Sequence, residues 1–328
     1  MTQQEFETQW RDANGYVVCH TSGSTGTPKE IHLDKEVMKA SAARTNEFFK
    51  ISARSRLHTC LDFKYIASKM MTVRADLAGC PLTSEIPSNR PLGDIGKDEV
   101  TLLSVVPSQM EWILDLPRMD NVRNILIGGS PIPSLLRKRI AMSGYQTWES
   151  YGMTETASHV ALRRVEEDAS NPFVTLPGIK VSLSAEGCLV ISIPDMEDVV
   201  TNDLAQLHSD TSFLILGRAD NCINSGGIKI MPEQLESQLG PFISFDYCIS
   251  SLPDKKWGER LVLVVDKGEC TLSDEIIAKA IAVRLNQFKK SLDPGVKTPK
   301  EIIVLRELPR TPNGKLNRNL LKSIISEY

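Results

Sequence analysis

Short apolar runs, each about as long as a buried strand, recur along residues 16–149 of this 328-residue chain. The expected strands are 16–20, 57–61, 102–106, 124–127 and 147–149. Between them lie segments with helical spacing: a helix capped by Asp34, then 67–78, 107–114, and a helix from Pro133 to Met142. Alternation of this kind favours a mostly parallel sheet with helices on its faces.

The pattern changes near residue 172. Residues 172–217 hold short β-rich runs without helical spacing, which predicts a small antiparallel sheet or barrel. Mixed strands and helices follow. We therefore expect an α/β fold with a large N-terminal domain (1–219) that includes this β-rich subdomain, and a smaller, mobile α+β C-terminal domain (220–328).

Composition limits the classes of partner. Hydrophobic residues make up 41% of the chain and charged residues 24%, as in a globular protein with a sizeable core. The net charge of −3 gives no basic field for nucleic acid or an anionic membrane, so we expect neither partner. No apolar stretch approaches the ~20 residues of a membrane span. The N-terminus lacks the features of a signal peptide, which favours a cytoplasmic location.

The seven cysteines are widely spread, with no C-x-x-C pair. This spacing supports neither a zinc site nor a disulfide framework, and we expect buried or incidental thiols. The five histidines are scattered singly, which favours structural roles for them. A homo-oligomer is compatible with the sequence.

A polar loop, Thr21–Lys29, directly follows the strand expected at 16–20. It holds five hydroxyl side chains, two glycines, a proline and a lysine. Glycine lets backbone N–H groups turn toward an anion, the hydroxyls add donors, and Lys29 adds a positive charge. The spacing is not that of a Walker A loop. A polar surface turn would have a similar composition, but the pattern at a strand end favours a nucleotide phosphate.

The loop closely resembles the signature loop of the adenylate-forming superfamily, which includes acyl- and aryl-CoA ligases and nonribosomal adenylation domains. Four more segments resemble the family's motifs, in the family's order and over nearly the whole chain. They are Tyr151-Gly152-Met153-Thr154-Glu155-Thr156, Gly217-Arg218-Ala219-Asp220, Ser225-Gly226-Gly227-Ile228-Lys229-Ile230-Met231-Pro232-Glu233 and Pro312-Asn313-Gly314-Lys315.

The resemblance implies ATP, Mg²⁺ and CoA as the small molecules bound. Glu155 would bind Mg²⁺, Thr154 would contact the α-phosphate, and Tyr151 would lie against the adenine. Asp203 and Arg218 would hold the ribose, although Thr201-Asn202-Asp203 departs from the family's Thr-Gly-Asp. The full implied nucleotide set is Thr21, Ser22, Gly23, Ser24, Thr25, Gly26, Thr27, Lys29, Gly129, Ser130, Pro131, Tyr151, Gly152, Asp203 and Arg218.

The C-terminal motifs imply a lid. By resemblance Asp220 is the hinge, Gly226 and Gly227 line the pantetheine channel, and Lys229 contacts CoA phosphates. Lys315 matches the adenylation lysine, so the catalytic residues would be Lys315, Glu155 and Thr154. Without the family, the two glycines would indicate a tight turn, and Lys315 a solvated loop residue.

The implied reaction joins a carboxylic acid to ATP as an acyl-adenylate and then transfers the acyl group to a thiol. About 20 residues precede the phosphate loop, and the family's aromatic-His element reads Phe63-Lys64-Tyr65-Ile66-Ala67-Ser68-Lys69. Such compact forms look most like o-succinylbenzoate–CoA ligases of menaquinone biosynthesis. That acid has a second carboxylate, for which Lys69, Ser158 and His159 are candidates, although Lys69 also suits a snorkelling helix residue.

Alternatives remain at this point. The chain could be another aryl- or acyl-CoA ligase, or a stand-alone adenylation enzyme that charges a carrier protein. A degenerate, non-catalytic relative is disfavoured because Lys29, Glu155, Asp203, Arg218 and Lys315 are all present.

Overall fold

The structure is a computed structural model that describes residues 1–20, 29–92, 95–292, 296–311 and 315–327. These residues form two compact units. Unit 1 consists of Met1–Ser184, Val190–Thr201 and Leu207–Leu214. Unit 2 consists of Ala185–Leu189, Asn202–Gln206 and Ile215–Tyr328. The division at 219/220 and the hinge at Asp220 stay predictions.

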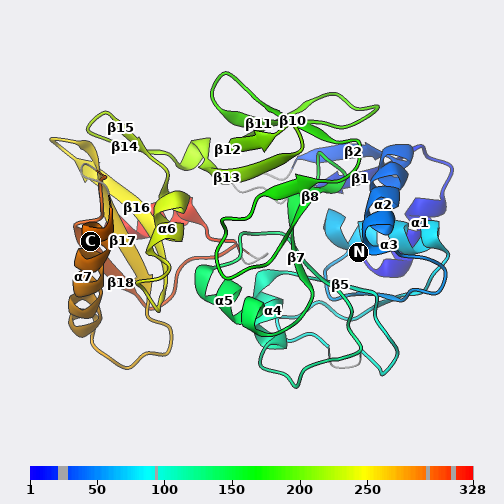
Figure 1. Cartoon of the computed structure of the whole chain (residues 1–328), viewed down its shortest axis with the longest axis horizontal. Coiled ribbons are helices and arrows are strands. Elements are labelled where there is room, and N and C mark those ends of the chain that lie inside the picture. The colour runs from blue at the N-terminus through cyan, green and yellow to red at the C-terminus, as the bar shows by residue number, and fades with distance from the viewer. Residues whose placement is uncertain (21–28, 93–94, 293–295, 312–314, 328) are drawn as a thin grey trace. The chain divides into compact units, whose positions relative to one another are not determined.

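A parallel sheet forms the centre of unit 1 (Figure 1). Its strands, in spatial order, are β4 (Leu82–Ser84), β3 (Leu57–Thr59), β5 (Leu102–Val105), β6 (Ile125–Ile127) and β7 (Thr147–Met153). The side chains of β3, β5 and β6 are all buried, as expected for parallel strands covered on both faces. The strands predicted near 57, 102, 124 and 147 are confirmed.

Helices cover this sheet. They are α1 (Gln3–Arg11), α2 (Lys35–Phe49), α3 (Ile66–Ala78), α4 (Pro107–Ile113) and α5 (Ser134–Met142). Asp34 caps α2 by accepting from the backbone N–H of Glu36, and Gly79 ends α3 in the left-handed conformation. Residues of α4 and α5 bury apolar side chains with those of β5 and β6 in one core cluster, and α1, α2 and α3 contribute to another.

The strand predicted at 16–20 is confirmed, but it does not join the parallel sheet. β1 (Tyr16–His20) pairs antiparallel with β2 (Glu30–Asp34) in a separate two-stranded ribbon. In β2 only Leu33 is buried, so the sequence gives little sign of this strand. The polar loop therefore connects the two strands of a hairpin.

The β-rich segment extends the large sheet and does not form a separate sheet or barrel. β8 (Ser158–Arg164) pairs antiparallel with β7, and β9 (Phe173–Thr175) pairs antiparallel with β8. The sheet then continues through β13 (Ser212–Arg218), β12 (Val199–Ser209), β11 (Cys188–Ser192) and β10 (Lys180–Leu183).

Unit 2 contains a second sheet with helices. Its strands are β14 (Ile223–Ser225), β15 (Ile228–Ile230), β16 (Asp246–Asp254), β17 (Gly258–Asp266) and β18 (Glu301–Leu305), and its helical segments are η1 (Ala219–Asn221), α6 (Pro232–Leu239), α7 (Asp274–Ser291) and α8 (Arg318–Ile325). Ile277, Ile281 and Leu285 of α7 share a core cluster with residues of β17, and α7 lies beside this sheet in Figure 1.

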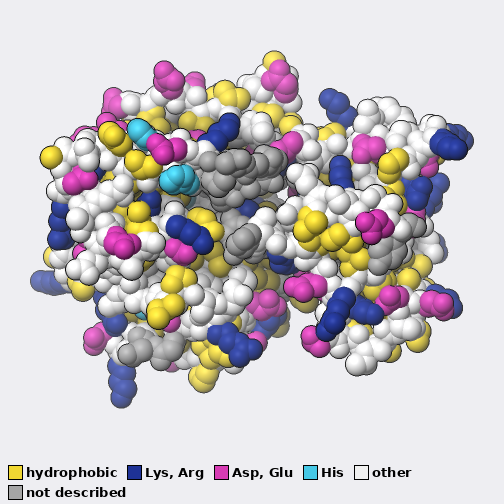
Figure 2. All heavy atoms as spheres, turned by 180° about the vertical axis from the view of Figure 1, so that it is seen from behind, with side chains coloured by type: hydrophobic (Ala, Val, Ile, Leu, Met, Phe, Trp, Pro, Cys, Tyr) yellow, Lys and Arg dark blue, Asp and Glu magenta, His cyan; other side chains and the backbone are white. Residues whose placement is uncertain are grey.

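The predicted α/β fold class is confirmed by these sheets and helices. Figure 2 shows basic and acidic side chains interspersed over one face, as the small net charge suggests. None of the helices that the structure describes combines the length and apolar character needed to cross a bilayer. The seven cysteines all lie within the described residues and form no disulfide with one another.

Candidate active site

The predicted phosphate loop falls mostly outside the described residues. This applies to Thr21, Ser22, Gly23, Ser24, Thr25, Gly26 and Thr27, whose roles stay predictions. The flanking strands are described: His20 pairs with Glu30, which directly follows Lys29. Antiparallel pairing thus holds the two ends of the loop next to each other.

Tyr151 and Gly152 lie on β7, just before the turn to β8. The register between these strands shifts at Tyr151/Gly152, and the backbones approach closely there. A Cβ atom on Gly152 would stand 2.2 Å from the carbonyl oxygen of Ser158 and 2.4 Å from Cα of His159. Only glycine, which has no Cβ, therefore fits at position 152, and it lets the two strands approach this closely.

The turn after β7 presents Thr154 and Glu155. Thr156 holds it closed: its Oγ1 accepts from the backbone N–H of Met153 at 3.0 Å and donates to the carbonyl of Ser158 at 2.7 Å. The carboxylate of Glu155 is exposed at this turn. A hard oxygen ligand in that position fits a magnesium ion shared with substrate phosphates.

The ring of Tyr151 is half-buried among aromatic side chains. Its centroid lies 5.3 Å from that of Phe213 and 5.7 Å from that of Phe173. These neighbours fix the plane of the ring, which would prepare it for contact with a base.

At the glycine pair after β6, the backbone closely approaches the neighbouring strand β7. A Cβ on Gly128 would stand 2.6 Å from Oγ of Ser150 on β7, and Gly129 has a φ of +90°. Ser130 and Pro131 follow and lead toward α5. Since β6 and β7 are parallel neighbours, the structure brings Gly129, Ser130 and Pro131 to the same sheet edge as Tyr151.

Lys69 of α3 is almost fully buried and does not snorkel to solvent. Its Nζ donates to the carbonyl of Val18 at 3.0 Å and lies 3.7 Å from Sγ of Cys19. Nζ also stands 5.7 Å from the centroid of the Phe6 ring. These contacts tie α3 to β1, the strand that leads into the phosphate loop; the predicted substrate role of Lys69 stays a prediction.

Ser158 and His159 both contact a buried arginine that the sequence analysis did not identify. Nη2 of Arg74 donates to Oγ of Ser158 at 3.1 Å and to Nδ1 of His159 at 3.3 Å. On the other side of the ring, Nε2 of His159 lies 3.1 Å from Oγ1 of Thr45, whose hydroxyl also donates to the carbonyl of Ser41. Burial and the nearby Arg74 charge hold the pKa of His159 well below its usual value. His159 is therefore neutral and accepts from Arg74.

Arg74 itself is 1% exposed. Within the described part of the chain, its Nε has no hydrogen-bond partner, and the partners of its other nitrogens, Met71, Ser158 and His159, include no carboxylate. Burial lowers the pKa of Arg74 to about 9, so the guanidinium is still a cation near neutral pH. A positive charge in an apolar helix run, Met70–Ala75, was the available sequence signal.

Four residues from three predicted motifs come together in unit 2. Arg218 donates to both carboxylate oxygens of Asp220, at 2.9 and 2.8 Å, and its Nη1 lies 3.4 Å from Oδ1 of Asp203. Lys315 stands close enough for the charges of Arg218 and Asp203 to act on it. Burial and Arg218 lower the pKa of Lys315, while Asp203 raises it.

The backbone of Lys315 is hydrogen-bonded to Thr311. Its backbone N–H donates to Oγ1 of Thr311 at 3.1 Å, and its carbonyl accepts from the N–H of Thr311 at 2.7 Å. The intervening residues 312–314 lie outside the described residues. This pairing fixes the backbone from which the Lys315 side chain extends.

Gly226 and Gly227 form a two-residue turn between β14 and β15, with φ values of +58° and +77°. The pair Ser225↔Ile228 closes this hairpin, which requires positive φ at both central residues. A Cβ on Gly226 would meet the Trp257 ring at 2.5 Å, whereas Gly227 faces open space. Lys229 is exposed on β15.

The predicted residues thus form three groups, one in unit 1 and two in unit 2. Gly129, Ser130, Pro131, Tyr151, Gly152, Thr154, Glu155, Ser158 and His159 gather at the β6 and β7 ends of unit 1. Asp203, Arg218, Asp220 and Lys315 meet in unit 2, and Gly226, Gly227 and Lys229 form a separate hairpin in that unit. Their individual roles stay predictions.

Known proteins are similar to this chain in sequence. An indoleacetate–CoA ligase from Aromatoleum aromaticum is 26% identical over 94% of this chain and 67% of its own length. A 2-succinylbenzoate–CoA ligase from Bacillus subtilis is 26% identical over 93% of this chain and 68% of its own. The chain therefore spans about two thirds of the length of these relatives.

Solved structures are also similar. An acyl-CoA synthetase (AMP-forming)/AMP-acid ligase II-like protein from Dyadobacter fermentans has 31% identity and a TM-score of 0.62, covering 98% of this chain and 93% of its own. The o-succinylbenzoate CoA synthetase from Bacillus subtilis, in complex with its acyl-adenylate intermediate, has 25% identity and a TM-score of 0.76. The match covers 93% of this chain and 68% of that protein.

The family model described as AMP-binding enzyme matches residues 3–190, more than half of the chain. This match includes the phosphate loop and the β7 turn with Glu155. Together with the Dyadobacter relative, which is 31% identical over nearly the whole chain, it shows that this chain belongs to the family of AMP-binding enzymes.

Proposed function

We propose that the protein is an ATP-dependent acid–CoA ligase that works through an acyl-adenylate. The observation that supports this most directly is the convergence of Lys315, Arg218 and Asp203 in unit 2. Lys315 comes from a segment more than 90 residues after Arg218 and Asp203, and each of the three matches a different motif of the family. A lysine near the residues that would hold the ribose is in a position to act on the α-phosphate of the same nucleotide.

In the first half-reaction, an oxygen of the acid forms a bond to the α-phosphorus of ATP, and the bond to pyrophosphate breaks. Lys315 would stand between the two anions and offset their repulsion as charge develops. Glu155 would hold Mg²⁺, which neutralises phosphate charge when it is bound. Thr154 would contact the α-phosphate, and Asp203 with Arg218 would fix the ribose.

In the second half-reaction, the thiol of CoA attacks the acyl carbonyl, a thioester forms, and AMP leaves. We propose that the C-terminal part of the chain turns about Asp220 between the two steps, which withdraws Lys315. The hairpin turn Gly226–Gly227 and Lys229 would then contact CoA. One or two residues that absorb a large change in φ and ψ are enough for such a movement.

We further propose 2-succinylbenzoate as the acid. Among the relatives, the named acids differ, so the choice depends on the chemistry of unit 1. Arg74 is a buried cation whose Nε has no partner among the described residues, and Ser158 and His159 contact its other end. A buried guanidinium is most stable beside a carboxylate, and a bidentate pair gives both energy and orientation. The second carboxylate of a dicarboxylic acid would supply it.

A pyrophosphate-release screen tests the function. The purified chain is incubated with ATP, Mg²⁺ and single acids, each with and without CoA. The acids are 2-succinylbenzoate, benzoate, indoleacetate and a long-chain fatty acid. We expect pyrophosphate and AMP with 2-succinylbenzoate and a thioester when CoA is present. Adenylate formation that ignores CoA would instead indicate a carrier-protein partner, and no turnover with any acid would contradict the proposal.

The role of Arg74 is tested separately, with Arg74→Lys and Arg74→Met. We expect the KM for 2-succinylbenzoate to rise about tenfold or more in Arg74→Met, since one charge-assisted contact contributes about 1.5–3 kcal/mol. Arg74→Lys should retain part of the affinity. The KM for benzoate, if it is a slow substrate, should change far less. Equal losses for both acids would show a structural role only, and thermal unfolding of each variant reports whether the fold is kept.

A further inference from the structure

The first strand pair of the parallel sheet carries a cluster of possible metal ligands that the sequence analysis did not expect. His58 lies on β3 and Cys60 directly follows that strand, two residues further on, so their side chains point to the same side of the extended chain. Thr83 lies on β4, and Glu85 directly follows that strand with the same spacing. The parallel register pairs His58 with Thr83, and one step further Cys60 stands opposite Glu85.

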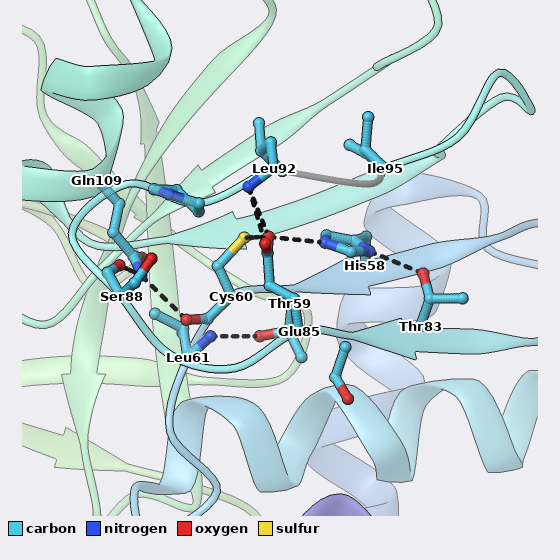
Figure 3. A network of polar contacts seen from close by, with 12 residues as sticks. His58, Thr59, Cys60, Leu61, Thr83, Glu85, Ser88, Leu92, Ile95 and Gln109 are labelled. Carbon is cyan, nitrogen blue, oxygen red and sulfur yellow. Dashed lines mark hydrogen bonds and ion pairs between the residues drawn. The ribbon is translucent and has the colours of Figure 1, made fainter.

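The side chains of His58, Cys60 and Glu85 meet (Figure 3). Nε2 of His58 lies 3.3 Å from Oε1 of Glu85, and Sγ of Cys60 lies 3.0 Å from the same oxygen. The three ligand atoms all lie within 4.8 Å of one another. His58 and Cys60 are buried, whereas Glu85 is partly exposed, which gives an ion a path to the cluster.

Other groups hold these side chains in place. The backbone N–H of Leu92 donates to both carboxylate oxygens of Glu85, at 2.7 and 2.9 Å. On the far side of the imidazole, Nδ1 of His58 lies 2.7 Å from Oγ1 of Thr83, whose hydroxyl is 3.3 Å from the carbonyl of Leu57. If Nδ1 carries the proton, it donates to Thr83 and Thr83 donates to Leu57. The lone pair of Nε2 then points toward Glu85, as a metal ligand requires.

We propose that His58, Cys60 and Glu85 bind one zinc ion. Zinc accepts imidazole, thiolate and carboxylate together, with bonds of about 2.0–2.3 Å, so its tetrahedral ligand atoms stand about 3.3–3.8 Å apart. The distances of 3.0 and 3.3 Å to Oε1 of Glu85 require only small movements to reach that range. A solvent molecule reaching the site past Glu85 would complete the four ligands.

The charges balance at this site. Hydrogen bonds from Cys60 and Leu92 outweigh the effect of burial and lower the pKa of Glu85, so this carboxylate is ionised. Burial keeps His58 neutral by lowering its pKa. On binding, the Cys60 thiol would release its proton to solvent and become a thiolate. Two ligand charges then cancel the two charges of zinc, which suits a buried position.

The zinc ion would link the chain segment that follows β3 to the segment Glu85–Leu92. The chain after Cys60 leads directly into α3, which carries Lys69 and Arg74. A zinc ion here would therefore stabilise the start of that helix. This inference does not depend on the proposed activity, because its readouts are metal content and stability.

The test begins with metal analysis of the full chain, purified without chelators and without an affinity tag that binds metal. We expect about one zinc ion per chain in the wild type, and loss of this zinc in Cys60→Ser and Glu85→Gln. Cys248→Ser is the matched control, because Cys248 is an equally buried strand cysteine outside the cluster. A strong chelator should lower the Tm of the wild type and of Cys248→Ser, and leave that of Cys60→Ser unchanged.

Cobalt replacement adds a spectroscopic readout. The Co²⁺-loaded wild type should show tetrahedral d–d bands and a thiolate-to-cobalt band in the near ultraviolet, and the latter should disappear in Cys60→Ser. If Cys60→Ser does not fold, the zinc content of Glu85→Gln and the cobalt spectrum of the wild type test the proposal instead. A wild type that takes up neither zinc nor cobalt, or a Cys60→Ser variant that binds zinc as tightly as the wild type, would overturn the proposal.

Discussion

Arg218 and Asp220 form a bidentate ion pair, with Nε and Nη2 of the guanidinium 2.9 and 2.8 Å from the two carboxylate oxygens. The pair fixes the plane of the guanidinium while Nη1 remains near Asp203. Arg218 lowers the pKa of Asp220 against the effect of burial, so the carboxylate is ionised. The residue proposed to hold the ribose is thus oriented by the residue proposed as the hinge.

Replacing Asp220 with asparagine keeps the shape and removes the charge. The ion pair is partly exposed, so its contribution is about 1 kcal/mol or less. We expect Asp220→Asn to raise the KM for ATP by about 2–5-fold, with the KM for the acid unchanged. Asp274→Asn, which disrupts an exposed ion pair with Lys267, is the control and should alter neither. An unchanged KM for ATP in Asp220→Asn would show that the pair does not orient Arg218.

Lys315→Ala removes the proposed adenylation lysine. The loss of one group that stabilises charge in the transition state costs about 10²–10³-fold in rate. We expect pyrophosphate release to fall by this amount, while thioester formation from preformed acyl-adenylate and CoA stays near the wild-type rate. Single-turnover measurements of the two steps separate these effects. An equal loss in both steps would refute the assignment.

The pH dependence of adenylation reports on the charge of Lys315. Because adenylation needs the protonated amine, the rate falls as the pH rises through its pKa, and burial together with Arg218 places that pKa below the ordinary 10.5 of lysine. Arg218→Gln removes a like charge, so it should raise the pKa and move the alkaline limb to higher pH. Asp203→Asn should move the limb to lower pH. The kcat for pyrophosphate release at saturating ATP measures both, and shifts in the same direction would contradict this electrostatic account.

The sequence predicted elements whose signal is local. The strand at 57–59 and the helix at 66–78 have apolar residues at characteristic spacings, and Asp34 marks the start of a helix. Strand pairing is not local. β2 has one buried residue, so nothing along the chain shows that β1 pairs with it and leaves the parallel sheet.

Contacts between distant segments also limited what the sequence could predict about the candidate site. Motif residues such as Glu155 and Lys315 could be found because each lies in a short recognisable segment. Arg74 belongs to no such segment, and its relation to Ser158 and His159 spans more than 80 residues. Likewise, His58 and Cys60 approach Glu85 only because a crossover places β4 beside β3 in parallel register. Spacing rules for metal sites cover local ligand pairs and miss this arrangement.

Gly152→Ala tests the close approach of β7 and β8. The new Cβ would collide with backbone atoms of Ser158 and His159, which cannot move away as a flexible side chain would. We expect destabilisation of about 1–3 kcal/mol and weaker nucleotide binding. Gly15→Ala is the control, because a Cβ there meets nothing within 4 Å, and its effect should stay within about 0.5 kcal/mol. Urea unfolding followed by tryptophan fluorescence measures both, and a neutral Gly152→Ala would show that the strands can separate at this point.

Glu149 is a buried carboxylate on β7. It is buried with two arginines: Arg137 of α5 donates to it from Nη2, and Nε of Arg163 lies 2.8 Å from the same oxygen. Although burial opposes ionisation, Arg163 and Arg137 together lower the pKa of Glu149. Stability from this carboxylate is therefore fully present above its unfolded pKa of about 4.5, and it is lost as the pH falls through the lower folded value.

Arg137→Ala removes one of the two partners of Glu149. Breaking a buried ion pair costs about 3–5 kcal/mol, and the remaining Arg163 places the expected loss near 3 kcal/mol. Arg139 lies on the same helix and pairs with the exposed Asp115 at 2.6 Å, so Arg139→Ala should cost about 0–1 kcal/mol. Urea unfolding at neutral pH compares the two. The difference in unfolding free energy between the wild type and Arg137→Ala should narrow as the pH falls through the lowered folded pKa of Glu149, whereas a constant difference would show that Arg137 acts through packing alone.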